Sequence, residues 1–158
     1  MPVFPKLLTM DNLLDLCIEG TNYLLLELPP VQFNNQLTEE ISELAYNRNI
    51  TPIISHVDEC LRYTSIESLE EILDLDVLGQ INASSFIDKE KRKLAFKLIH
   101  NNYIHVLGSG ANDTVNNPAL MKEAEIIIYK KFSRRLYGDF MENAKLVLHN
   151  RKIEEILL

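Results

Sequence analysis

The sequence predicts an α/β fold in which alternating βαβ units build a parallel sheet. The first observation is that short apolar runs of about six residues alternate with amphipathic stretches of about twelve residues. The second is that the apolar runs are continuous and do not alternate with polar residues. Continuous runs are typical of strands that are covered on both faces or rolled into a barrel. In both arrangements, ligands bind at the carboxyl ends of the strands.

Four apolar runs are the predicted strands, and each ends in residues that could contribute to a site. The runs span residues 22–28, 50–57, 77–83 and 103–107. Pro29 and Pro30 stop the first run, because proline has no backbone N–H to donate to a strand ladder. The residues at the four carboxyl ends are Glu27 and Leu28, Ser55 and His56, Asn82 to Ser85, and Gly108 to Gly110.

Six amphipathic stretches are the predicted helices. They span residues 9–19, 37–48, 65–75, 88–101, 118–132 and 137–150, and a short apolar tail follows at 153–158. Thr9 and Thr38 are the predicted N-caps of the first two helices, and Gly20 is expected to end the first. Pro118 is expected at the first position of the fifth helix. A basic run, Lys89 to Lys93, is interpreted as a solvated helix face.

Length, charge and composition narrow the class of protein. A chain of 158 residues suits a single domain with a sizeable core. The net charge of −7 argues against a nucleic-acid surface. No apolar run reaches the roughly 20 residues that span a bilayer, so no membrane span is expected. Two separated cysteines, and a start without the pattern of a secretory signal, favour a cytoplasmic protein.

Two side chains at the predicted strand ends have metal-ligand chemistry. Glu27 is a carboxylate in an apolar strand, which requires a cation, an arginine or a position at the rim. His56 leaves a strongly apolar strand, and a histidine there is either structural or a ligand. If the segment from His56 to Cys60 were extended, it could offer a nitrogen, a carboxylate and a thiolate on one side. Its spacing matches no common structural zinc site.

Other kinds of site receive little support. Cys60 is not the nucleophile of a cysteine phosphatase, because Ile66 stands where that loop needs an arginine to hold phosphate. Ser84 and Ser85 have no evident histidine and acid partners for a triad. The loop that begins at Gly108 could cradle an anion with its backbone amides, but no nucleotide-binding motif follows the first strand. The candidate anion-binding residues are Ser109, Gly110 and Asn112.

Five segments occur in an informative order along the chain. They are YLLLELP at 23–29, PIISH at 52–56, QINASS at 80–85, IHVLGS at 104–109 and ENAKLVLHN at 142–150. Together they resemble the C-terminal part of the PHP-type (polymerase and histidinol phosphatase) protein tyrosine phosphatases of bacterial capsule and exopolysaccharide systems. The resemblance covers nearly all of this chain, which would form one partial PHP-like domain over residues 1–158.

The resemblance carries expectations about fold and activity. It implies a distorted (β/α) barrel, of which this chain would form a part. It also implies a cluster of metal ions, usually manganese, that activates a water molecule to hydrolyse phosphotyrosine on a partner tyrosine kinase. Glu27 and His56 fall on metal-ligand positions of the family.

Other family positions are changed in this sequence. The family's Ser-Asp-Ala-His loop corresponds to residues 109–112, where Gly110 and Asn112 replace an aspartate and a histidine. Glu59 replaces an anion-binding arginine, and Asn117 replaces a second one. A glutamate expected near the start is replaced around Pro5, and the N-terminal His-x-His pair is absent. Because a multinuclear site needs several carboxylates and imidazoles, the remaining ligands are not expected to hold one tightly. Glu59 is expected to repel a phosphorylated substrate.

Three interpretations follow from these residues. The preferred one is a degenerate or truncated relative with little or no catalysis, which acts as a binding or regulatory module for a tyrosine kinase or another polysaccharide-biosynthesis protein. The second is an active metal-dependent phosphatase completed by another chain. The third is an unrelated small α/β protein that binds an anion. Because four strands cannot close such a barrel, we also expect a homo-oligomer or a partner chain at the exposed sheet edges.

Overall fold

The computed structural model describes residues 7–109 and 118–157. Its centre is a four-stranded parallel sheet in the order β1-β2-β3-β4, and the strands follow this order along the chain as well. The α/β fold with a parallel sheet is therefore confirmed. The strands are β1 (Tyr23–Glu27), β2 (Thr51–Ser55), β3 (Leu78–Asn82) and β4 (Val106–Gly108).

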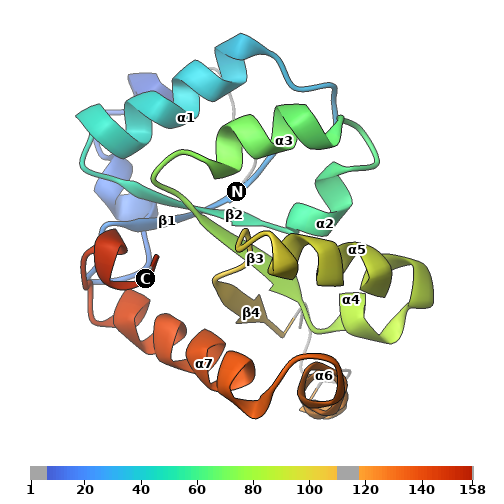
Figure 1. The fold of residues 1–158 in the computed structure, drawn as a ribbon. Coiled ribbons are helices and arrows are strands. Elements are labelled where there is room, and N and C mark those ends of the chain that lie inside the picture. The colour runs from blue at the N-terminus through green and yellow to red at the C-terminus, as the bar shows by residue number, and fades with distance from the viewer. Residues whose placement is uncertain (1–6, 110–117, 158) are drawn as a thin grey trace.

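Helices connect the strands and cover the sheet. The main crossover helices are α1 (Asn35–Asn47), α3 (Ile66–Leu73) and α5 (Lys89–His100). Two further helices, α6 (Pro118–Lys131) and α7 (Arg134–Leu148), follow β4. In Figure 1, α1 and α3 lie on one side of the sheet and α7 lies on the opposite side. No helix among the described residues is long and apolar enough to cross a membrane.

Buried side chains on both faces of the sheet explain why the strands are continuous apolar runs. Successive residues of a strand point to opposite faces, so each strand contributes to two cores. The larger core joins one face, including Leu24, Leu26 and Ile54, to the crossover helices. The smaller core joins the other face to the end of α7 and the C-terminal segment. Its buried members are Tyr23, Ile53, Leu78, Val106, Val147, Ile153 and Ile156.

Polar side chains set where most of the helices begin. Ser65 and Asp88, the first residues of the predicted helices at 65–75 and 88–101, cap α3 and α5. Pro118 is the first residue of α6, as the sequence predicts. The predicted cap Thr38 is wrong, because Oδ1 of Asn34 accepts the backbone N–H of Leu37 at 3.0 Å and starts α1 earlier. The last helix also starts earlier than predicted, since the Ser133 hydroxyl accepts the backbone N–H of Leu136.

The predicted helix over residues 9–19 is wrong. This region contains two short 3₁₀ helices, η1 (Leu7–Thr9) and η2 (Leu13–Leu16), separated by a turn. Thr9 ends the first of them and does not cap a longer helix. Only Leu7 and Leu13 are buried in these two elements, so the apolar face is too small to hold a longer helix against the core. Gly20, with φ of +75°, lies in the turn that leads into β1.

Two short helices at the strand ends were not predicted. α2 (Val57–Cys60) begins two residues after the end of β2, and α4 (Ser84–Ile87) begins two residues after the end of β3. A third short element, η3 (Ile153–Glu155), lies in the apolar tail. The position of α2 matters most for the site, because it turns the chain immediately after His56.

Candidate functional site

The four parallel strands bring their carboxyl ends to one edge of the sheet. The register pairs Glu27 with Ser55 and Asn82 with Gly108. Because ligands bind at this edge in parallel α/β folds, the candidate site lies here. The hydroxyl of Ser55 donates to the carbonyl oxygen of Leu26 at 3.0 Å, which fixes the ends of β1 and β2 against each other.

The structure brings Glu27 and His56 to one cavity of about 230 Å³ at this edge. The sequence places these two residues at the ends of neighbouring strands, and the cavity explains how they could act together. The other residues that line it are Leu28, Pro29, Pro30, Ser55, Glu59, Cys60 and Tyr63. A pocket of this size suits a small polar group more than a bulky side chain.

His56 is held in a specific orientation. Its backbone has φ of +54° and ψ of +42°, the left-handed conformation that a residue with a Cβ rarely adopts. This conformation turns the chain from β2 into α2. The imidazole Nδ1 lies 2.8 Å from Nδ2 of Asn82, and the backbone N–H of His56 donates to Oε1 of Gln80 at 3.3 Å. Both partners come from β3.

The acid and the thiol that follow His56 are turned into the protein. Asp58 is 4% exposed and accepts a hydrogen bond from the Ser85 hydroxyl at 2.7 Å. Burial raises the pKa of the Asp58 carboxyl. Cys60 donates to the carbonyl oxygen of His56 at 3.7 Å, and burial raises the pKa of its thiol to about 12. Since α2 is helical, the extended zinc-binding arrangement of this segment does not form.

Glu59 stands where the resemblance expects an arginine, but its charge is not isolated. Nζ of Lys91, on α5, lies 2.8 Å from Oε1 of Glu59. This hydrogen bond lowers the pKa of the Glu59 carboxyl. Lys91 is partly exposed, as a residue of the predicted solvated face would be, and it also pairs with a residue of the cavity. The pair offsets part of the repulsion that Glu59 would exert on an anion.

Sequence reasoning places Asn82 and Ser85 at a strand end without partners, and it misses Gln80 and the pairing of Lys91 with Glu59. The spacing of Gln80 and Asn82 on a strand is a usable signal, because residues two apart lie on the same face. Nothing in the sequence pairs Ser85 with Asp58 or Lys91 with Glu59.

The candidate anion-binding loop is only partly described. Ser109 is exposed at the end of β4. The remaining candidates Gly110 and Asn112, together with Asn117, lie outside the described residues, so their predicted roles stay predictions.

The side chains at the strand ends do not fit a metal cluster as they stand. Asp58 and Glu59 are bound to Ser85 and Lys91, and the Cys60 thiol is buried with a raised pKa. Among residues 7–109 and 118–157, no three His, Cys, Asp or Glu side chains are grouped so that they could hold a metal ion. Glu27 and His56, the two residues on family metal-ligand positions, line the cavity together with Glu59 and Cys60. Their predicted metal role stays a prediction.

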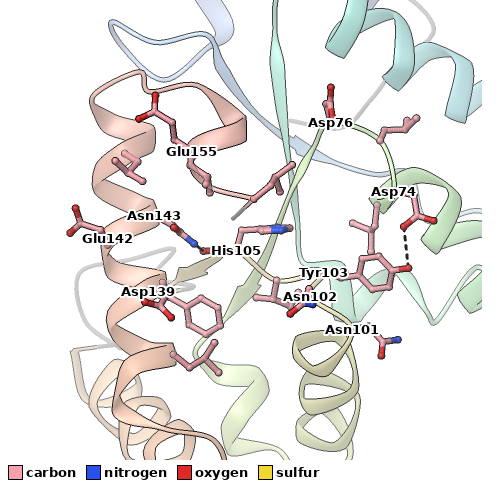
Figure 2. A pocket seen from close by; sticks show the side chains of 18 of the residues that line it. Asp74, Asp76, Asn101, Asn102, Tyr103, His105, Asp139, Glu142, Asn143 and Glu155 are labelled. Atoms are coloured by element: carbon pink, nitrogen blue, oxygen red, sulfur yellow. Dashed lines mark hydrogen bonds between the residues drawn. The ribbon is translucent and has the colours of Figure 1, made fainter.

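A larger cavity of about 750 Å³ lies away from these strand ends. Figure 2 shows it beside α7 and the segments that precede β3 and β4, with His105 and Asn143 near its centre and several carboxylates around it. The Tyr103 hydroxyl donates to Oδ1 of Asp74 at 3.2 Å on one side of it. Because ligand sites in this fold class form at the carboxyl ends of strands, the smaller cavity is the candidate site.

The parallel sheet, its crossover helices and the polar strand ends define the chain as an α/β protein with a candidate site at one edge of the sheet. The sequence model of the family described as "Capsular polysaccharide synthesis, CpsB/CapC" matches residues 6–149. The chain therefore belongs to the CpsB/CapC family. This membership excludes the interpretation of an unrelated α/β protein.

Individual relatives agree with this assignment. The chain is 30% identical over 152 residues to the "Putative tyrosine-protein phosphatase CapC" of Staphylococcus aureus, covering 87% of this chain and 56% of that protein. It is 32% identical over 117 residues to the "Tyrosine-protein phosphatase CpsB" of Streptococcus agalactiae serotype III strain NEM316, covering 66% and 47%. The chain thus spans about half the length of the curated relatives it matches.

A solved structure supports the fold. It comes from crystal structures of YwqE from Bacillus subtilis and CpsB from Streptococcus pneumoniae, described as unique metal-dependent tyrosine phosphatases. The superposition has a TM-score of 0.81 with 22% sequence identity, and it covers 96% of this chain and 63% of that chain.

Proposed function

We propose that these 158 residues form a CpsB/CapC scaffold that serves capsular or exopolysaccharide synthesis mainly by binding a partner protein, with little or no phosphotyrosine hydrolysis of its own. The observation that carries the proposal is the state of the residues after β2. Asp58 is engaged by Ser85, Glu59 is engaged by Lys91, and His56 is engaged by Asn82. Catalytic groups in a working site are held in geometry toward a substrate, whereas each of these three side chains has a polar partner within the protein.

The proposed partner is a tyrosine kinase or another protein of the same polysaccharide system. The tyrosine phosphatase names of the relatives CapC and CpsB support a partner that carries phosphotyrosine. The proposed location is the cytoplasm, which the two free cysteines Cys17 and Cys60 support, because reduced thiols persist there. Residues 1–158 are proposed to act as one partial PHP-like domain.

Turnover and metal content test this proposal together. The purified chain is incubated with a phosphotyrosine peptide and added manganese, beside the variants His56→Ala and His149→Ala. His149, the exposed residue that follows α7, does not line the candidate cavity, so it is the matched control. We expect the same background turnover from all three proteins and no stoichiometric manganese. Turnover that is lost in His56→Ala and retained in His149→Ala would contradict the proposal.

A second candidate function is an active metal-dependent phosphatase that another polypeptide segment completes. The observation that favours it is that Glu27 and His56, the two residues on family metal-ligand positions, line the same cavity. Addition of a polypeptide with the family's His-x-His segment should then produce metal-dependent turnover that requires Glu27. No gain on addition would leave the scaffold function as the better explanation.

The sheet edges are the proposed contact surfaces. β1 and β4 are the outer strands of the sheet, and open sheets need cover at their edges. We therefore propose a homo-oligomer or a partner chain at these strands. Light scattering at micromolar concentration tests the homo-oligomer, and a strictly monomeric species there would leave only the partner chain.

A further inference from the structure

A chain of three hydrogen bonds runs from the backbone of His56 back to its own imidazole. The backbone N–H of His56 donates to Oε1 of Gln80 at 3.3 Å. Nε2 of Gln80 donates to Oδ1 of Asn82 at 3.0 Å. Nδ2 of Asn82 lies 2.8 Å from Nδ1 of His56 and closes the loop. All three residues lie at the carboxyl ends of β2 and β3, beside the cavity that His56 lines.

The direction of this chain is fixed at its first link. A backbone N–H can only donate, so the oxygen of the Gln80 amide must face it. The NH₂ group of Gln80 then faces Asn82, whose oxygen must accept, and the NH₂ group of Asn82 faces the imidazole. Turning the Asn82 amide alone would place its NH₂ group against the NH₂ group of Gln80, and neither could accept a hydrogen bond. Turning both amides would place the NH₂ group of Gln80 against the backbone N–H of His56, so that two donors would face each other. Nδ1 of His56 is therefore a hydrogen-bond acceptor.

The surrounding backbone keeps both amides in place. Gln80 and Asn82 are two residues apart on β3, so their side chains share one face of the sheet. Gly108 pairs with Asn82 on β4, and a Cβ at position 108 would overlap Nε2 of Gln80 and approach Oδ1 of Asn82 at 2.8 Å. The missing side chain at this position leaves the space in which the amides meet. Asn82 is 8% exposed, so water does not compete freely for its bonds.

We propose that Gln80 and Asn82 are positioning residues that hold neutral His56 with its proton on Nε2, so that His56 offers a hydrogen-bond donor where a metal ligand would offer a lone pair. A metal-bound histidine uses one ring nitrogen as the ligand and donates from the other to an acceptor. Here Nδ1 already accepts from Asn82. A metal at Nε2 would require the proton to move to Nδ1, where it would face the NH₂ group of Asn82. The positioning of His56 therefore opposes metal binding and favours a ligand with an acceptor atom.

The substitution Asn82→Asp is expected to move the proton of His56 from Nε2 to Nδ1 by a change of one functional group. An aspartate has two acceptor oxygens, so one can keep the bond from Nε2 of Gln80 while the other accepts a proton carried by Nδ1. The lone pair of Nε2 is then released for a ligand. Gln80→Glu is a second, independent reversal. Its carboxylate forces the NH₂ group of Asn82 to turn toward it, which leaves the Asn82 oxygen facing His56.

Long-range nitrogen–proton NMR of the nitrogen-15-labelled chain reads the tautomer directly, at a pH above the range in which histidines usually titrate. In the wild type, we expect the unprotonated nitrogen of His56 to be Nδ1. In Asn82→Asp and Gln80→Glu, we expect a proton on Nδ1. His105 is an internal control in every spectrum, since its Nδ1 accepts the backbone N–H of Gly79 at 3.0 Å and its proton should stay on Nε2.

Manganese binding is the second readout, followed by paramagnetic broadening of the ring signals. We expect Asn82→Asp to bind at least tenfold more tightly than the wild type, with broadening at His56 and none at His105. A wild-type His56 that carries its proton on Nδ1 would overturn the proposal. The same holds if both reversal variants keep the proton on Nε2. Since the wild-type spectrum alone decides the first point, a variant that fails to fold does not remove the test.

Discussion

Nζ of Lys91 on α5 lies 2.8 Å from Oε1 of Glu59 on α2, at the position where the family resemblance expects an arginine. Both side chains are partly exposed, so the pair contributes less than about 1 kcal/mol to folding. Its greater effect is on the charge of the cavity, because Glu59 stays ionised with a lowered pKa. The first prediction concerns that charge.

Replacement of Glu59 is expected to change the affinity of the cavity for phosphate. Glu59→Arg places a cation beside Lys91, and charge-assisted hydrogen bonds favour an anion. We expect Glu59→Arg to bind inorganic phosphate roughly tenfold more tightly than the wild type, which corresponds to about 1.4 kcal/mol. Glu59→Gln, which removes the charge without adding one, should lie between them. Titration calorimetry gives the three affinities, and equal values would show that position 59 does not face the bound anion.

The Asp58–Ser85 hydrogen bond gives a prediction about stability and pH. Ser85→Ala removes the one hydrogen-bond donor to a buried carboxylate, because Oδ1 of Asp58 has no partner among the described residues. We expect a loss of about 2 kcal/mol at neutral pH, since hydrogen bonds to charged groups are worth about that much. Urea unfolding with Ser84→Ala as the exposed neighbouring control measures it.

The sign of the pH effect follows from the pKa of Asp58. Burial raises this pKa in the folded state, so the folded protein takes up a proton before the unfolded chain does as the pH falls. The ionised form is the one that Ser85 stabilises. The loss in free energy of unfolding caused by Ser85→Ala should therefore become smaller as the pH falls through the pKa that Asp58 has in the folded protein. A deficit that stays constant with pH would contradict this assignment.

The sequence predicts the scaffold well because the scaffold depends on local pattern. The four apolar runs became β1 to β4, since most of their side chains are buried against the two cores on either side of the sheet. The predicted helix over residues 9–19 failed because Leu13 is the one residue of η2 that is buried, and propensity alone does not hold a helix. The start of α1 was misplaced because Asn34 and Thr38 are both good caps, and tertiary context chose the earlier one.

The sequence predicts where the candidate site lies, but it does not predict the contacts that the side chains of the site make. The rule about strand ends places Glu27 and His56 correctly at one cavity. The pairs that decide what these residues can do join distant parts of the chain. Lys91 and Glu59 are 32 residues apart, and Ser85 and Asp58 are 27 apart. No short segment of the sequence contains both partners of such a contact. The sequence therefore shows that family metal ligands are missing, but it does not show which contacts the remaining side chains make.

The buried side chain of His105 leads to a prediction about the stability of the fold in mild acid. Its Nδ1 accepts the backbone N–H of Gly79 beside the cavity of Figure 2, and burial lowers its pKa from 6.5 to about 4. Between these pH values the unfolded chain binds a proton that the folded protein does not, so stability falls as the pH falls. The total loss is on the order of 3 kcal/mol, since each tenfold change in proton affinity is worth about 1.4 kcal/mol.

His105→Asn tests this contribution. The asparagine oxygen can accept the same backbone N–H from nearly the same position, but it does not titrate. We expect the free energy of unfolding of this variant to vary less between pH 6.5 and 4 than that of the wild type. His149→Asn changes an exposed side chain and is the control. Its free energy of unfolding should change with pH in the same way as that of the wild type. A wild-type curve that is flat over this range would exclude the assigned role.

Glycines in the sheet give the last prediction, because the segment that precedes β4 approaches β3 too closely for a side chain at Gly79. A Cβ at Gly79 would overlap the backbone carbonyl oxygen of Tyr103. The backbone cannot retreat there without breaking the bond from the N–H of His105 to the carbonyl oxygen of Gly79, which measures 2.9 Å. We expect Gly79→Ala to cost about 3 kcal/mol or to prevent folding.

Two other glycines calibrate that result in the same thermal and urea unfolding experiments. Gly138 lies in α7 with nothing within 4 Å of an added Cβ, so Gly138→Ala should stabilise the protein by about 0.5–1 kcal/mol. Gly108→Ala meets the flexible end of Gln80, so it should fold with a smaller loss than Gly79→Ala. It should also disturb the hydrogen bond between Gln80 and Asn82, visible as altered ring nitrogen signals of His56. If Gly79→Ala were as stable as the wild type, the close approach of Tyr103, which precedes β4, to β3 would be wrong.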